Sequence, residues 1–391
     1  MVRVAFLIVA PLALFCCIHA QADDGVVDTA TCSGEADPSQ SSAVDRDLVD
    51  MDQDSPRSLW DFMRVFRSLG TSWSHVFGQY TDVVKTAHGT TMKGDIYADD
   101  LSEGIKLLQN LIGQAITDAA VVQPPETGDK WDFRAVPFDE FEVTLDDLLV
   151  AFLKWSAVDI SEEEDGFCHL RGGVNRKGII PINVSNAFRR LEAYATWMDE
   201  EGADLIDPPL TLESISKSRD LLYSRITHDE CGRTIWWLDL SQTNFEGIKE
   251  LPQKEILRFF VWIAHIIMFD EQAQDSGILF VDNMAQVSFF QYMTMLPVQL
   301  GMAVDKFMIG VIPLKTKLVV FMDRPLWFDA AFGLIRFILP KNMKDRVALP
   351  EGDQRSMEEI VGISKFPEGF GNFQGSLAED LIAAREMTAT A

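Results

Sequence analysis

The chain has 391 residues, of which 47% are hydrophobic, with 60 acidic against 34 basic side chains and a formal net charge of −26. This length suffices for one large domain or two modest ones. A chain this acidic does not attract nucleic acid through its overall field, which argues against a nucleic-acid partner.

Residues 1–22 have the pattern of a secretory signal peptide. Arg3 precedes an apolar run from Val4 to Ile18, and Ala20-Gln-Ala22 places small residues around a cleavage site. The run is short for a membrane span, so we predict cleavage before Asp23 and a location in the secretory pathway or outside the cell. The alternative is a cytoplasmic protein that associates peripherally with membranes.

Cleavage removes Arg3 and no acid, which changes the net charge from −26 to −27. It leaves Cys32, Cys168 and Cys231, which allow at most one disulfide plus a free thiol and lack the spacing of a zinc site. The sequence Asn183-Val-Ser185 is an N-glycosylation sequon, and it predicts a glycan on Asn183 if the chain enters the secretory pathway.

Composition and periodicity divide the rest of the chain into five segments. They are an acidic leader (23–57), a helical N-terminal extension (58–138), a small helical domain (139–225), a larger domain of alternating strands and helices (226–375) and a tail (376–391). The leader is rich in Asp, Ser, Gln and Glu, which predicts disorder. An insertion over 161–182 splits the small helical domain. Apolar spacing predicts the main helices over 141–160, 184–198, 212–222, 254–269 and 285–311, and strands over 234–240, 277–282, 318–322 and 361–366.

Two short apolar runs, Gly277 to Asp282 and Leu318 to Met322, define the larger domain. Each is bounded by polar residues or Pro, as strands buried on both faces are. The helical segment between them, broken near Pro297, makes the unit a strand, a helical crossover and a parallel strand. The fold class is therefore predicted as α/β.

Residues 326–339 form a predicted helix that is apolar on nearly every side. Its polar or small positions, Asp329, Gly333 and Arg336, lie in one thin stripe at helical spacing. Fourteen helical residues extend about 21 Å, which is too short to cross a bilayer. Such a helix needs a core behind it and an apolar partner in front, although on composition alone a plain core helix is the commoner explanation.

The sequence provides no catalytic or metal-binding constellation. His169, His228 and His265 are scattered, with no nucleophile in a recognisable elbow and no paired acid. The glycines of the 161–182 insertion follow no strand, so they do not form a phosphate loop. We expect no enzymatic activity, no catalytic residue and no metal.

With these features in view, the chain resembles the CRAL-TRIO lipid-binding family, over about residues 140–375. The resemblance is most specific at Ile312-Pro-Leu-Lys-Thr-Lys-Leu-Val-Val-Phe-Met-Asp-Arg-Pro325, and it continues through Gly277 to Asp282, Lys344-Asp-Arg346 and Phe366-Pro-Glu-Gly-Phe-Gly371. The sequence departs from the family pattern at Asp323, where Asn is usual, and at Phe337 and Ala285, where Pro and Gly are usual.

The resemblance implies a mostly parallel sheet with helices around an apolar lipid pocket over 226–375, preceded by the small all-helical domain. It implies non-enzymatic binding and transfer, or sensing, of a hydrophobic lipid, with no cofactor other than that ligand. It makes residues 326–339 the mobile gate helix. The expected pocket and gate residues are Phe280, Trp327, Phe328, Phe332 and Ile335.

Lys315, Lys317 and Arg346 resemble the basic residues with which tocopherol and retinal carriers of this family contact phosphoinositide headgroups. Window 301–350 has eight basic and four acidic residues, a net of +4 in an acidic chain. These residues predict docking on an anionic membrane surface, with ordinary solvated surface as the alternative. Leu314 stands where phosphatidylinositol exchange proteins have Glu, which argues against a phosphatidylinositol pocket.

A rival function keeps the lipid-binding fold as a protein-interaction or regulatory scaffold. In that case residues 58–138 would bind a protein partner. Bound lipid separates the two hypotheses, because a carrier holds lipid in stoichiometric amount and a scaffold does not.

Overall fold

The computed structural model describes residues 94–122, 130–133, 136–157, 181–336, 346–371, 373 and 379–389. The predicted signal peptide, the acidic leader, the first part of the N-terminal extension and nearly all of the 161–182 insertion lie outside these ranges. None of the helices within them is long and apolar enough to span a bilayer.

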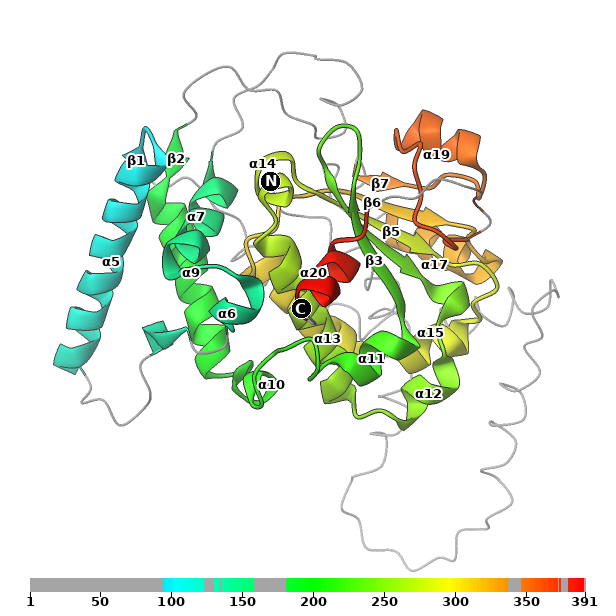
Figure 1. The fold of residues 1–391 in the computed structure, drawn as a ribbon, viewed down its shortest axis with the longest axis horizontal. Coiled ribbons are helices and arrows are strands. Elements are labelled where there is room, and N and C mark those ends of the chain that lie inside the picture. The colour runs from blue at the N-terminus through cyan, green and yellow to red at the C-terminus, as the bar shows by residue number, and fades with distance from the viewer. Residues whose placement is uncertain are drawn as a thin grey trace, which may run out of the picture.

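A helical layer lies on one side of the molecule (Figure 1) and contains α5 (Leu101–Val122), α7 (Leu145–Ser156) and α9 (Val184–Asp199), which pack against one another. The short segments β1 (Tyr97–Ala98), η1 (Lys130–Asp132), α6 (Phe138–Phe141), β2 (Ile182–Asn183) and α10 (Ala203–Ile206) complete it. Strands β1 and β2 pair antiparallel. Helix α5 belongs to the predicted N-terminal extension, yet it shares one apolar core with the helices of the small helical domain.

The remaining residues build a five-stranded sheet in the order β3-β4-β5-β6-β7. Its strands are β3 (Tyr223–His228), β4 (Thr234–Asp239), β5 (Ile278–Asn283), β6 (Thr316–Met322) and β7 (Val347–Ala348). Strands β4 to β7 run parallel, and β3 pairs antiparallel with β4. The predicted α/β class with a mostly parallel sheet is confirmed.

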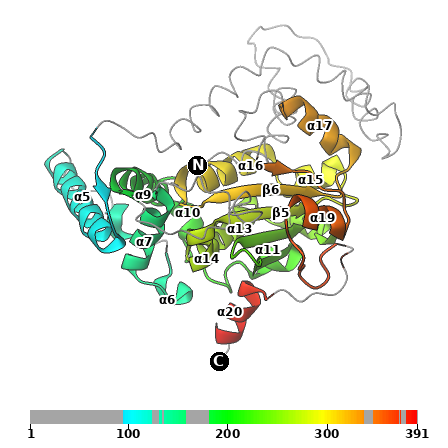
Figure 2. The same cartoon turned by 90° about the horizontal axis from the view of Figure 1, so that it is seen from above.

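The sheet is covered on both faces, as its continuous apolar strands require. One face packs against the large core that contains α11 (Ser216–Leu221), η2 (Leu240–Gln242), α12 (Phe245–Glu250), α13 (Gln253–Met268), α14 (Glu271–Ser276), α15 (Phe289–Met295), α16 (Val298–Asp305), the π-helical segment η3 (Lys306–Val311) and α17 (Leu326–Arg336). The opposite face packs against α19 (Gln354–Ile360) and the loop that follows it. The last helix, α20 (Leu381–Ala389), lies beside β3. Figure 2 shows α17 next to α15, at the end of the sheet that lies away from α5.

Two parts of the sheet differ from the prediction. Strand β3 was not expected, because its Tyr-Ser-Arg-Ile-Thr-His sequence is mostly polar and lacks the apolar run that marks β5 and β6. The strand predicted at 361–366 is wrong, since this segment forms no strand. Gly362 there has φ +77, and Val361, Ile363 and Phe366 all bury their side chains against the sheet face instead of pairing at its edge.

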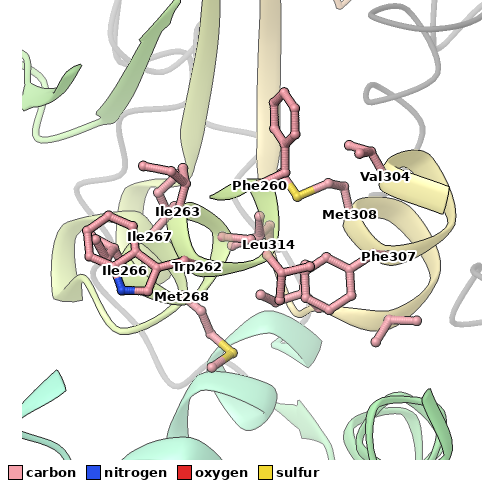
Figure 3. Packing of buried hydrophobic residues seen from close by; sticks show 14 of the residues in the cluster. Phe260, Trp262, Ile263, Ile266, Ile267, Met268, Val304, Phe307, Met308 and Leu314 are labelled. Atoms are coloured by element: carbon pink, nitrogen blue, oxygen red, sulfur yellow. The ribbon is translucent and has the colours of Figure 1, made fainter. Parts of the chain in front are cut away.

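Helix α13 is buried along most of its length, and Figure 3 shows its Phe260 side chain next to Met308 of η3. It also carries polar links to the helical layer, because Arg258 donates to the Leu205 carbonyl oxygen of α10 and the Tyr194 hydroxyl lies 2.6 Å from His265 Nε2. His265 Nδ1 lies 2.7 Å from the Val261 carbonyl oxygen, which can only accept, so Nδ1 carries the proton and Nε2 accepts from Tyr194. Burial lowers the pKa of His265 to about 4.

Candidate functional site

The described part of the molecule contains an apolar cavity between the sheet and helices α13, α15 and α16. Ten of its lining side chains are apolar or aromatic, and the eleventh is Asp282: Trp236, Leu238, Leu240, Phe260, Phe280, Asp282, Tyr292, Met295, Leu296, Val304 and Met308. Figure 3 shows Phe260 on α13 facing Val304 and Met308. The sheet supplies the floor of the cavity, and the three helices supply its walls.

The cavity encloses about 30 Å³. Pockets that hold a drug-sized ligand have volumes of about 300–1,000 Å³, so the cavity has no room for a lipid tail. The pocket in this structure is therefore much smaller than the deep pocket expected from the sequence, although its lining is apolar as expected. A lipid enters this space only if the wall helices move outward.

Asp282 is the one carboxylate that faces the cavity. It follows Phe280 by two positions on β5, so both side chains point to the same side of the sheet. Its neighbours in register are Leu238 on β4 and Phe321 on β6. The side chain is 4% exposed, and no described group donates a hydrogen bond to it. Desolvation raises the pKa of Asp282 to about 7.

Asp282 was not among the residues predicted from the sequence. A signal for it existed, because an acid at the end of an apolar strand, in phase with Phe280, must face the same core as that phenylalanine. The sequence-based interpretation instead treated Asp282 as the polar boundary of the strand.

Of the expected pocket and gate residues, only Phe280 lines the cavity directly. Trp327, at the start of α17, packs against the Tyr292 ring in a tilted arrangement at a centroid distance of 5.6 Å, and Tyr292 in turn lines the cavity. The Trp327 indole also donates a hydrogen bond of 2.9 Å to the Val287 carbonyl oxygen. Trp327 therefore joins α17 to the helix that forms the cavity wall.

Phe328 and Phe332 attach α17 to the sheet. Phe328 packs on Phe321 of β6 with ring centroids 4.7 Å apart, and Phe332 stacks on Phe328 at 5.9 Å. Both side chains are buried. The side chain of Ile335 lies outside the described residues, so its predicted place in the gate stays a prediction.

The comparison with known families identifies this unit. Residues 219–371 match the model of the CRAL/TRIO domain. The chain contains a CRAL/TRIO domain. Among solved structures, one titled "Crystal structure of Sfh5" is similar over 53% of this chain and 78% of that chain, with 12% sequence identity and a TM-score of 0.36. The matched residues begin on α11 and end at Gly371, so they contain the whole sheet and the cavity.

The three predicted membrane-binding residues lie together at one edge of the CRAL/TRIO domain. Lys315 directly precedes β6, Lys317 lies within it, and Arg346 precedes β7 and donates a 3.0 Å hydrogen bond to the Thr316 carbonyl oxygen. A Cβ atom on Gly277 would come within 2.6 Å of Lys317 Cγ, so glycine there lets the lysine stem cross the start of β5. Lys315 is only 4% exposed, whereas Lys317 and Arg346 are partly exposed.

This basic edge lies at the amino end of β6, whereas α17 begins after its carboxyl end. Seven strand residues extend about 23 Å, so the basic residues are far from Leu326, the first residue of α17. Leu326 is 76% exposed, and Phe290 on the adjoining α15 is 48% exposed. The exposed apolar side chains of Leu326 and Phe290 therefore lie toward the carboxyl end of β6, whereas the basic residues lie at its amino end.

Asn183 of the predicted glycosylation sequon is 4% exposed and caps α9. Its side-chain nitrogen, the atom that would carry a glycan, donates to Asp95 at 2.9 Å and to Tyr97 at 3.3 Å. This nitrogen is buried in the folded protein, and a glycan on it would remove at least one of the two hydrogen bonds.

The polar cluster at the carboxyl edge of the sheet is structural. Asp239 accepts hydrogen bonds from Asn283 Nδ2 at 2.8 Å, Ser241 Oγ at 2.6 Å, Gln242 Nε2 at 2.6 Å and the Gly371 amide at 2.8 Å. These bonds satisfy both carboxylate oxygens and fix the loop that closes the CRAL/TRIO domain. Within the described ranges, no group of His, Cys, Asp and Glu side chains has the geometry to hold a metal ion.

Proposed function

We propose that this protein binds a hydrophobic lipid without modifying it, and that it transfers or senses that lipid at membrane surfaces. Proteins with a CRAL/TRIO domain are generally lipid-binding carriers. The observation that supports the proposal most strongly is the apolar cavity inside the domain, whose wall helix α15 is joined to α17 through Trp327. Each CH₂ group moved from water into such a cavity contributes about 0.8 kcal/mol.

In this proposal α15 and α17 open as one gate. Their joint movement separates Tyr292, Met295 and Leu296 from the sheet and enlarges the cavity. The exposed side chains of Leu326 and Phe290 then contact the apolar layer of a membrane, which compensates for the apolar surface that the gate uncovers. A partner surface that is itself apolar therefore favours the open state, and water favours the closed one.

The alternative function is a protein-interaction scaffold that has kept the fold. The small volume of the cavity, about 30 Å³, is the observation that favours it. In that case α5 and the rest of residues 58–138 bind the protein partner.

Lipid extraction from the purified full-length protein tests the proposal against this alternative. The extract is analysed by mass spectrometry, and the lipid recovered is expressed per mole of protein. We expect lipid in near-stoichiometric amount, retained through gel filtration. Protein that is folded but carries no lipid, and that takes up none from mixed vesicles, would favour the scaffold.

We further propose that the basic edge orients the protein on an anionic membrane, with Lys317 and Arg346 making the contacts and the more buried Lys315 adding its charge to that edge. Phosphoinositides are the headgroup that the resemblance implies, and other anionic lipids provide the same charge. Each basic residue near such a surface contributes about 1 kcal/mol, within a Debye length.

Replacement of the basic edge is expected to weaken vesicle binding. The Lys317→Ala/Arg346→Ala variant loses about 2 kcal/mol, or roughly 30-fold in partitioning onto anionic vesicles at low salt, and adding Lys315→Ala weakens it further. The matched control is Lys249→Ala/Arg355→Ala, which removes two exposed basic residues elsewhere. Sedimentation with anionic and neutral vesicles, at low and high salt, measures the effect. Equal loss in both double variants would assign the effect to overall charge.

We also propose that the protein acts in the secretory pathway or outside the cell. The arrangement of Arg3, the apolar run and Ala20-Gln-Ala22 supports this location. A second observation agrees with it, because Cys231 is disulfide-bonded, and disulfides persist in oxidising compartments. N-terminal sequencing of the mature protein should begin at or close to Asp23.

A further inference from the structure

Asp282 is an exception among the buried acids of the sheet. Asp239 on β4 has both oxygens bonded, and Asp229, in the turn between β3 and β4, forms an ion pair with Arg233. Asp282 is equally buried, yet no described side chain or backbone group bonds its carboxyl or neutralises it. Buried polar groups without a partner are costly and rare, so each requires an explanation.

The position of the Asp282 carboxyl suggests an explanation for its burial. It lies on the floor of the cavity, where every other lining residue is apolar or aromatic, and its nearest neighbours across the sheet are Leu238 and Phe321. A cavity built in this way offers a bound molecule a large apolar contact and one polar contact. Small-molecule sites have this composition, with the few polar groups fixing the orientation of the ligand.

We propose that Asp282 is the polar anchor of the lipid site and that the ligand is a lipid alcohol, which enters hydroxyl end first. This inference rests on the proposed lipid-binding function and adds the chemical class of the ligand. The hydroxyl donates a hydrogen bond to the carboxylate, and the hydrocarbon part fills the space between the sheet and the wall helices.

Other polar lipid ends match this carboxyl less well. A fatty acid or a phosphate group would bring a second negative charge next to Asp282 in an apolar space, where like charges repel strongly. An ester or ether oxygen accepts hydrogen bonds and cannot donate one. A hydroxyl both donates and accepts, so it pairs with Asp282 whether the side chain is charged or protonated, which matters because burial holds the pKa of this carboxyl near 7.

The test compares four probes that differ only at the polar end. A sixteen-carbon chain with a terminal pyrene is prepared as the alcohol, the methyl ether, the primary amine and the carboxylic acid, and binding to the full-length protein is followed by fluorescence at pH 8. A hydrogen bond to a charged group changes affinity by about tenfold or more. We expect the wild-type protein to bind the alcohol at least about tenfold more tightly than the ether, and to bind the acid most weakly.

Two variants assign this preference to Asp282. Asp282→Leu should bind the alcohol and the ether equally, and Asp282→Asn should accept the acid that the wild-type protein rejects. Asp204→Leu, which changes an exposed acid, should keep the wild-type order. Near-UV circular dichroism checks that each variant is folded, and the Asn variant carries the test if the Leu variant does not fold.

The outcomes separate this inference from the function on which it rests. Equal binding of alcohol and ether by the wild-type protein, or a preference that survives both substitutions, overturns the role of Asp282 and leaves lipid binding intact. Tightest binding of the amine retains the carboxylate as anchor but overturns the lipid alcohol as ligand. Binding of none of the four probes by folded protein contradicts the inference and the proposed lipid-binding function together.

Discussion

Between pH 4 and pH 8, the stability gained on replacing Asp282 with Asn is expected to increase by about 4 kcal/mol. Desolvation raises the pKa of Asp282 from its ordinary value of 3.8 to about 7 in the folded protein. The folded state therefore holds a proton that the unfolded state has lost, and wild-type stability falls as pH rises from 3.8 to about 7. At about 1.36 kcal/mol per pH unit, this interval gives about 4 kcal/mol as an upper limit.

Urea unfolding of the variant and the wild-type protein at pH 4, 5, 6, 7 and 8 measures this difference. The comparison is needed because His265 titrates in the opposite sense. Burial lowers its pKa from 6.5 to about 4, so its contribution to stability is lost as pH falls through this range. The two effects largely offset each other in the wild-type protein. Asp204→Asn is the control, and an Asp282→Asn difference that stays constant from pH 4 to pH 8 would mean that Asp282 is not desolvated.

The second large effect is expected for Phe332→Asp. Phe332 is 4% exposed and stacks on Phe328, which packs on the sheet. Removal of a buried Phe costs about 3–5 kcal/mol, and the new carboxylate must also leave water or push α17 outward. We expect α17 to detach while the sheet remains folded, so that lipid loading is lost and the free energy of unfolding falls by several kcal/mol.

Leu145→Asp is the matched control, because Leu145 is 47% exposed and lies on α7, away from the gate. This variant should remain as stable as the wild-type protein and should load lipid from detergent. Circular dichroism and lipid mass spectrometry on both variants make the comparison. Complete unfolding of Phe332→Asp would show that α17 is part of the permanent core, and unchanged loading would show that it does not control access.

The main strands were predictable because burial on both faces leaves a clear pattern. The runs that became β5 and β6 are continuous and apolar, which parallel central strands require. Strand β3 pairs at the edge of the sheet, and its short sequence Tyr223–His228 is mostly polar, so it showed neither an apolar run nor a regular alternation. The apolar segment at 361–366 has strand composition, but its side chains cover the sheet.

The site was predicted less completely than the fold, because its character depends on how distant segments pack. Trp327, Phe328 and Phe332 were selected for their place on an apolar helix, and the structure puts Tyr292 between that helix and the cavity. Burial of Lys315 depends on the edge formed by β5, β6 and β7, which no local pattern describes. That no described group bonds Asp282 is likewise a property of the packed molecule, since a strand sequence alone does not show which groups reach a carboxylate.

Photo-cross-linking of a lipid to the protein tests the central claim most directly. A long-chain alcohol with a diazirine in the middle of its chain is equilibrated with the full-length protein and irradiated, and the labelled peptides are identified by mass spectrometry. The account predicts labels on the cavity lining from β5, α15 and η3, including Phe280, Tyr292 and Met308, and competition by the unlabelled alcohol. Labels confined to the helical layer of α5, α7 and α9, or no label that the alcohol displaces, would contradict it.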